Sequence, residues 1–153
     1  MLRVAPMLML LLSVFSTQSY ANSASIEQFK QLMQENKGKV VYIDFWASWC
    51  IPCKQSFPWM NKMQQKYAER GLKVVTINLD MERSFADEFL RQTPADFTVI
   101  YDPKSLIARK FDLKGMPSSY IYNRQGKAVK AHVGFQPERQ DEYEAELVAL
   151  LAQ

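Results

Sequence analysis

Cys50 and Cys53 are the only cysteines in this chain of 153 residues, and two residues separate them. Two thiols at this spacing can close into a disulfide and open again, and the thiolate form of one can attack a disulfide in another molecule. The same spacing occurs in zinc sites, so the pair alone does not decide between redox chemistry and metal binding. The segments on either side of the pair narrow the choice.

The pair lies where an expected strand passes into an expected helix. Residues 40–43 form a short apolar run that favours a buried strand, and after Cys53 apolar residues recur three and four positions apart. The first turn of a helix stabilises a thiolate, so we expect the pKa of Cys50 to lie below that of a free cysteine. Cys53 lies one turn later on the same face, where it can close on Cys50 or resolve a mixed disulfide. Pro52 suits an early helical position because it has no N–H to lose.

Several stretches of the chain resemble one protein family. Residues 49–54, Trp-Cys-Ile-Pro-Cys-Lys after a hydrophobic strand, resemble the thioredoxin superfamily. Residues 78–80, 97–102, 115–121 and 126–127 resemble more narrowly the extracytoplasmic TlpA/ResA/DsbE-type thiol–disulfide oxidoreductases. The resemblance extends from about residue 25 to the C-terminus. It implies a thioredoxin fold, an α/β architecture with a central mixed sheet flanked by helices, and a TlpA/ResA-like αβ insertion between Asp80 and Gly115.

The resemblance implies a catalytic role for Asp44. In the thioredoxins an acid at this position lies buried beneath the second cysteine and shuttles its proton. Cys53 must lose a proton before it attacks a mixed disulfide, and a buried carboxylate with a raised pKa is a suitable base near neutrality. The alternative is a surface aspartate at the end of a strand.

The resemblance also implies a substrate-binding surface beside the cysteines. The Met116–Pro117 peptide is expected to be cis and to pack beside the disulfide, with the Met116 backbone offered as a short strand edge; an ordinary trans turn is the alternative. Trp49 and Pro52 are expected to complete this surface.

Two features depart from the family pattern. Some ResA-like proteins carry an active-site Glu shortly after the second strand, at a position that is Met81 here, and the sequence assigns that role to neither Asp80 nor Glu82. Thr76 stands about where thioredoxins place a lysine close to the buried acid. We therefore expect Asp44 to lack a cationic partner, which would raise its pKa further.

The order of the expected elements agrees with this architecture. Strands alternate with helices and are followed by a hairpin and a last helix, which predicts a parallel sheet covered by helices with an antiparallel hairpin at one side. The expected helices cover residues 50–70 and 82–92 and begin near residues 23 and 137; the expected strands cover residues 40–45, 73–78, 97–101, 119–122 and 128–133.

Residues 1–21 have the pattern of a secretory signal peptide, and residues 22–153 would then form one thioredoxin-like domain. Arg3 gives a positive start, residues 4–15 are largely apolar, and residues 19–21 place small side chains at the two positions that determine cleavage. The apolar run is shorter than the roughly 20 residues that a membrane span needs. From the signal-peptide pattern we expect an exported protein that works in the bacterial periplasm. An uncleaved membrane anchor is the alternative.

Composition and charge argue against other classes of function. The chain is 48% hydrophobic and 23% charged, which is typical of one globular domain. The net charge of +3 comes from scattered basic residues, so nucleic-acid binding, which needs a basic patch, is not expected. His132, the only histidine, lies in an expected hairpin strand, where we expect a solvated side chain rather than a catalytic or metal-binding one.

Thiol–disulfide exchange leaves the direction of electron flow open. The resemblance suggests a reductase that takes electrons from a membrane thiol donor of the DsbD/CcdA kind and acts on disulfide-bearing proteins such as apocytochrome c. A disulfide donor would use the same residues. A Cu(I) carrier is a further alternative, since Cys50, Cys53 and Met116 are soft ligands. We expect the reductase, as a monomer, with no cofactor and no metal site.

Overall fold

The computed structural model describes residues 24–153, so the expected signal peptide over residues 1–21 lies outside the described residues. The helices are α2 (Ala24–Glu35), α3 (Ile51–Tyr67), α4 (Arg83–Gln92), α5 (Ala108–Phe111) and α6 (Gln140–Leu151), with short 3-10 turns at Ala68–Arg70 and Pro137–Arg139. The strands are β1 (Val40–Trp46), β2 (Leu72–Asn78), β3 (Thr98–Tyr101), β4 (Ser118–Tyr122) and β5 (Ala128–Val133). No helix among these residues is both long enough and apolar enough to cross a membrane.

The five strands form one mixed sheet in the order β3-β2-β1-β4-β5. β1 is central, parallel to β2 and antiparallel to β4, while β3 extends the parallel half and β5 closes the hairpin with β4. Because β1 and β2 are parallel, both end at the same edge of the sheet. The segments that follow Trp46 and Asn78 therefore meet at that edge, and the first of them carries the cysteines.

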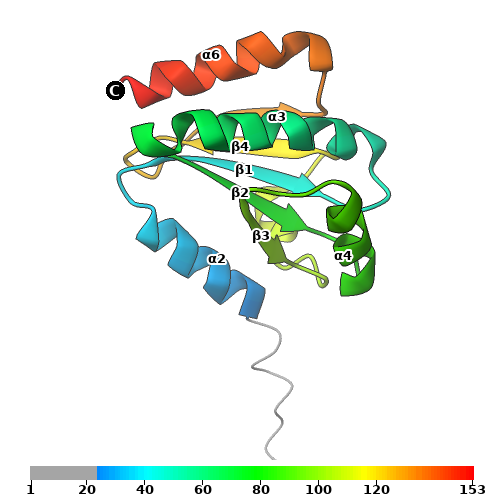
Figure 1. Cartoon of the computed structure of the whole chain (residues 1–153). Coiled ribbons are helices and arrows are strands. Elements are labelled where there is room, and N and C mark those ends of the chain that lie inside the picture. The colour runs from blue at the N-terminus through cyan, green and yellow to red at the C-terminus, as the bar shows by residue number, and fades with distance from the viewer. Residues whose placement is uncertain (1–23) are drawn as a thin grey trace, which may run out of the picture.

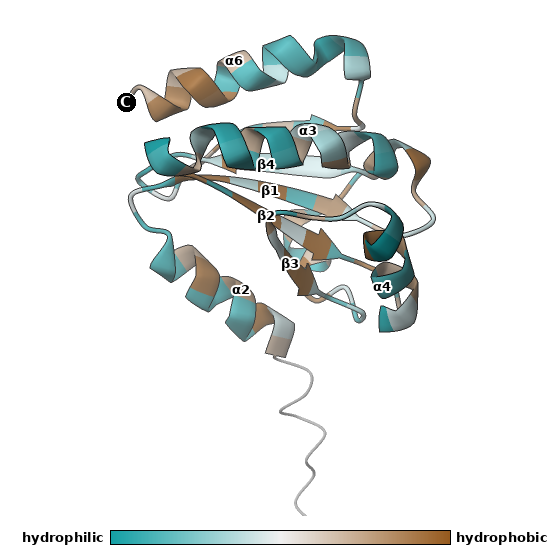
Figure 2. Ribbon diagram, in the orientation of Figure 1, coloured by the Kyte–Doolittle hydropathy of each residue, from teal (hydrophilic) through white to brown (hydrophobic). Residues whose placement is uncertain are grey.

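Both faces of the sheet are covered, as Figure 1 shows: α3 and α6 lie over one face and α2 over the other. Successive side chains of a strand point to opposite faces. Val40, Tyr42 and Trp46 accordingly pack in a cluster with α3 and α6, whereas Val41, Ile43 and Phe45 pack in a second cluster with residues of α2 and α5. Every residue of β1 is buried as a result. Figure 2 shows the matching hydropathy pattern, with hydrophobic residues along β2 and β3 and in stripes on α2.

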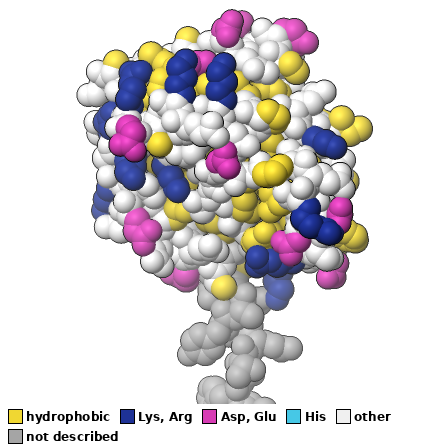
Figure 3. Space-filling view, in the orientation of Figure 1, with side chains coloured by type: hydrophobic (Ala, Val, Ile, Leu, Met, Phe, Trp, Pro, Cys, Tyr) yellow, Lys and Arg dark blue, Asp and Glu magenta, His cyan; other side chains and the backbone are white. Residues whose placement is uncertain are grey.

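The surface carries mixed charge. Figure 3 shows Lys and Arg side chains interspersed with acidic and apolar side chains over the face in view. Many of the charged side chains form exposed ion pairs, such as Lys30 with Glu27 and Arg83 with Asp87.

Candidate functional site

Cys50 and Cys53 form a disulfide at the start of α3, with Cα atoms 5.2 Å apart. Cys50 is the N-cap residue of the helix, and its Sγ accepts a hydrogen bond from the backbone N–H of Cys53 at 3.3 Å. Cys53 is 0% exposed and Cys50 is 5% exposed. The sulfur that an incoming disulfide can reach is therefore the one at the N-terminus of the helix, where a thiolate is stabilised.

A tight turn delivers Cys50 to this position. The Cys50 N–H donates to the Ala47 carbonyl at 3.0 Å, so the chain reverses between β1 and α3. Pro52 lies within the first two residues of α3, as its missing N–H favours. Trp49 and Ile51, the neighbours of Cys50 in the chain, are 70% and 75% exposed.

Asp44 is buried on the face of the sheet that α3 covers, two residues from Trp46 in β1. Its Oδ2 has no hydrogen-bond partner among the described residues. Burial raises the pKa of Asp44 well above its usual value. Thr76 is the residue opposite Asp44 on β2, and its Oγ1 accepts the indole N–H of Trp46 at 3.1 Å. As expected from the sequence, no lysine stands at this position, and the carboxyl group is not the surface aspartate of the alternative interpretation.

The Met116–Pro117 peptide is cis, as expected from the resemblance. Pro117 is buried, and Met116 borders a groove that is also bordered by Trp49, the chain neighbour of Cys50. The groove is lined by Trp49, Leu79, Leu113, Lys114, Gly115 and Met116. It therefore brings together two residues that the sequence singled out, Trp49 and Met116. Leu79 and Leu113 were missed because single apolar residues in loops carry no periodic signal.

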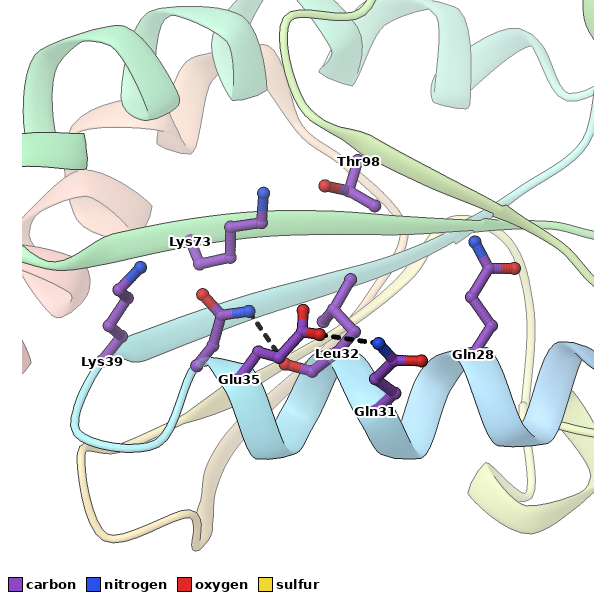
Figure 4. Close-up of a pocket in the computed structure, with 8 residues that line it drawn as sticks. Gln28, Gln31, Leu32, Glu35, Lys39, Lys73 and Thr98 are labelled. Atoms are coloured by element: carbon purple, nitrogen blue, oxygen red, sulfur yellow. Dashed lines mark hydrogen bonds between the residues drawn. The ribbon is translucent and has the colours of Figure 1, made fainter.

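A second, more polar cavity lies at the opposite end of the sheet, between α2 and the first residues of β2 and β3 (Figure 4). Its lining residues are Gln28, Gln31, Leu32, Glu35, Asn36, Lys39, Lys73 and Thr98. Burial, with a contribution from Lys39, lowers the pKa of Lys73. Because β1 runs away from this end toward the cysteines, this cavity is not part of the redox site.

The two acids that the sequence left without a role differ sharply. Asp80 is buried and accepts hydrogen bonds from Ser48 and Asn78. Glu82 is exposed at the N-cap position of α4, and its side chain forms no capping hydrogen bond.

Trp46, which follows Asp44 on the same face, is a packing residue: it is fully buried, and its ring lies 4.9 Å from that of Phe57.

The expectation of a solvated His132 was wrong. Its side chain is only 17% exposed, and its Nε2 lies 2.8 Å from Oε2 of Glu146 on α6. Its ring also packs edge-on against Tyr143. The expectation considered β5 alone, and α6 covers this part of the hairpin.

Comparison with known proteins identifies the family. Residues 18–148 match the Redoxin family model. The chain belongs to the Redoxin family. The thioredoxin-like protein YneN of Bacillus subtilis is 33% identical to this Redoxin over 125 residues, which are 77% of this chain and 70% of YneN.

Two thiol-disulfide oxidoreductases named ResA are also similar. The protein from Bacillus cereus is 30% identical over 115 residues, which are 75% of this chain and 66% of that protein. The protein from Bacillus subtilis is 28% identical over 102 residues, 67% of this chain and 57% of that protein. The chain thus matches less than two thirds of the length of these ResA proteins.

Solved structures agree with the fold of this Redoxin. A crystal structure described as a thiol:disulfide interchange protein DsbE from Chlorobium tepidum is 50% identical, with a TM-score of 0.76, and the match covers 78% of this chain and 84% of that one. StoA from Bacillus subtilis is 25% identical, with a TM-score of 0.60, over 71% of this chain and 84% of that one. The expected thioredoxin-like fold and the ResA/DsbE-type resemblance are confirmed.

Proposed function

We propose that this Redoxin is a thiol–disulfide oxidoreductase that reduces disulfides in other proteins through Cys50 and Cys53. One observation carries the proposal: the two sulfurs are bonded at the N-terminus of α3, where Cys50 is 5% exposed and Cys53 is fully buried. This asymmetry gives the cysteines different tasks. The names of the similar proteins, thiol-disulfide oxidoreductase and thiol:disulfide interchange protein, support the same chemistry.

The reaction begins with both cysteines reduced. The Cys50 thiolate attacks one sulfur of a target disulfide, and the other target sulfur leaves as a thiolate and takes up a proton. Cys53 then loses its proton and attacks the Cys50 sulfur of the mixed disulfide, which releases the second target sulfur. The target has gained two electrons and two protons, and Cys50 and Cys53 end as the disulfide seen in the structure.

Asp44 is the proposed base for Cys53. It lies on the face of the sheet against which Cys53 packs, and both side chains are buried. Burial raises the pKa of Asp44, which brings its proton affinity closer to that of a thiol and so favours transfer between them near neutral pH.

The groove beside the disulfide is the proposed binding site for the target. Among the described residues, the backbone N–H and carbonyl of Met116 form no hydrogen bond, so both are available to an extended peptide. Trp49 forms one wall of the groove. Pro52 lies between the two cysteines in the chain, and Pro117 follows Met116. An apolar target side chain near its cysteine suits this lining, in which Lys114 is the only charged residue.

The expected setting is the bacterial periplasm, after removal of residues 1–21 as a signal peptide. A membrane thiol donor of the DsbD/CcdA kind would regenerate the reduced protein, which would act as a monomer. Apocytochrome c is a suitable target, because its paired cysteines must be reduced before haem attachment.

A trapping experiment tests the division of labour. Reduced Cys53→Ser protein mixed with a protein disulfide such as insulin should accumulate a mixed disulfide that dithiothreitol releases, because Cys50 attacks but nothing resolves the product. The matched Cys50→Ser variant should trap little. Trapping by Cys50→Ser instead, or by neither variant, would contradict the proposal.

The reduction potential tests the direction. A value near that of thioredoxin, about −270 mV, supports a reductase, whereas a value near that of DsbA, about −120 mV, would make the protein a disulfide donor. The measurement needs only equilibration of the purified protein with dithiothreitol or glutathione.

A further inference from the structure

Asp80 forms a buried clamp on the turn that carries Cys50. Its Oδ1 accepts the Ser48 hydroxyl at 2.8 Å, and its Oδ2 accepts the Ser48 backbone N–H at 2.9 Å. Oδ2 also accepts an N–H of the Asn78 side chain at 2.7 Å. Asp80 is only 4% exposed and Ser48 is partly buried, so these bonds are partly shielded from water. Hydrogen bonds to a buried carboxylate are stronger than those between neutral groups.

The clamp joins two segments that are 32 residues apart in the chain. Ser48 follows the end of β1 and Asp80 follows the end of β2, where the parallel strands bring both segments to one edge. The backbone adds to the link, because the Leu79 N–H donates to the Trp46 carbonyl at 2.9 Å. Asn78 in turn fixes Asp80 from the other side, since its Oδ1 accepts the Asp80 N–H at 3.2 Å.

Ser48 lies inside the turn between Ala47 and Cys50. Holding Ser48 by both its N–H and its hydroxyl fixes where Cys50 enters α3. That entry determines whether the Cys50 Sγ faces the Cys53 N–H, which donates to it at 3.3 Å. We propose that Asp80 is a positioning residue that keeps the Cys50 sulfur against the first turn of α3. The proposal rests on the role of Cys50 as the attacking thiol in the proposed function.

A clamp and a charge effect predict opposite results. If Asp80 acts mainly as a negative charge near the thiol, its removal should favour the Cys50 thiolate. If it acts as a clamp, its removal should disfavour the thiolate, because the helix N–H groups no longer face the sulfur. Asp44 on β1, Lys54 on α3 and Lys114 in the groove lining are also charged, and all three are kept in the test.

The test measures the pH dependence of Cys50 alkylation by iodoacetamide in a Cys53→Ser background, where a single thiol reacts. This readout needs no disulfide exchange, so its result is independent of whether the protein reduces insulin. The variants are Asp80→Ala, Asp80→Asn and Ser48→Ala. The matched control is Asp87→Ala, which removes an exposed carboxylate from α4. Amide hydrogen exchange at Ser48 reports directly on the clamp.

At pH 7, Asp80→Ala should slow alkylation about tenfold, with the pH midpoint shifted upward by about one unit. Asp80→Asn can still bond both Ser48 groups and should stay within about threefold of the parent protein. Ser48→Ala, which keeps the charge and one of the two bonds, should also slow alkylation, by about threefold. Exchange of the Ser48 N–H should speed up in Asp80→Ala.

Three results would overturn the proposed positioning role of Asp80. The first is faster alkylation of Cys50 in both Asp80 variants, and the second is an equal loss of alkylation rate in Asp80→Ala and Asp80→Asn. The third is an alkylation rate in Ser48→Ala equal to that of the parent protein. If Asp80→Ala does not fold, Ser48→Ala decides alone, because it deletes one hydroxyl group and leaves the carboxylate in place.

Discussion

Asp44 lies directly opposite Thr76 on β2, and the Thr76 hydroxyl oxygen accepts the indole N–H of Trp46. The residue across the sheet from the buried acid is thus neutral and already engaged with another side chain. Burial therefore raises the pKa of Asp44 with no opposing cation. This relationship determines how Asp44 contributes to the pH dependence of stability.

Replacing Asp44 with Asn should stabilise the oxidised protein at high pH. An acid with a raised folded-state pKa stabilises the fold fully only below its unfolded-state pKa of about 3.9, and this contribution is lost as the pH rises through the folded-state pKa. At pH 8.5 the variant should exceed the parent in free energy of unfolding by about 1.4 kcal/mol for each unit of raised pKa. Near pH 4 the two should converge. Urea denaturation at both pH values measures this, and a gap that does not change with pH, or that Asp87→Asn reproduces, would contradict it.

The same substitution should slow the second step of the reaction. Without a base for Cys53, resolution of the mixed disulfide at pH 7 should fall about 100-fold, at the low end of what general bases contribute. The rate of attack by Cys50 should change much less. At pH 9.5, where hydroxide deprotonates Cys53, the gap should narrow. Rapid-quench kinetics, in which the transient mixed disulfide is stopped and counted at set times, measures its formation and its resolution separately. Equal effects on both rates would refute a specific role of Asp44 at Cys53.

The groove should matter for protein targets and not for small ones. Trp49→Ala removes an exposed ring from the groove wall and should raise the KM for insulin roughly tenfold, since aromatic anchors at interfaces are commonly worth 1–2 kcal/mol or more. Turnover of a small aromatic disulfide should stay nearly unchanged. Val129→Ala, which shortens an exposed apolar side chain at the other end of β5, is the control. If activity on insulin and on the small disulfide fell equally, Trp49 would be acting on the reactivity of the cysteines and not on target binding.

The aromatic cluster beneath α3 should dominate the stability of this half of the protein. Phe57 is fully buried and contacts the rings of Trp46, Phe89 and Phe97. Phe57→Ala should therefore cost about 3–5 kcal/mol of unfolding free energy. Phe85→Ala, on the exposed side of α4, should cost less than about 0.5 kcal/mol. Urea denaturation of both variants is sufficient, and similar costs would show that the cluster is not the core of this face.

Local patterns predicted the elements well, because their causes are local. The apolar run at residues 40–43 lies in β1, and the ends of the helices and strands named in advance differ from expectation by only a few residues. The strand order depends on contacts between distant segments, which hydrophobic periodicity does not record. Only the resemblance to the thioredoxin superfamily implied the strand order.

The chemistry was predictable where the residues are neighbours in the chain. The Cys50–Cys53 disulfide and its place at a helix start follow from a short stretch of sequence. The link between Ser48 and Asp80 was missed, because it joins segments 32 residues apart. A signal was nevertheless present: both residues follow parallel strands that had been predicted, and the ends of adjacent parallel strands meet. His132 was misjudged for the opposite reason, since no local pattern reveals that α6 covers its strand.

The disulfide closes a very short segment of chain, because its cysteines are only three positions apart. The chain entropy that such a bond removes from the unfolded protein amounts to about 2 kcal/mol for a loop of about four residues, against about 4.7 kcal/mol for a loop of 100. Opening the bond therefore leaves the sheet and its helices held by their own packing. The reduced protein should therefore keep the same fold as the oxidised one and be less stable by about 2 kcal/mol.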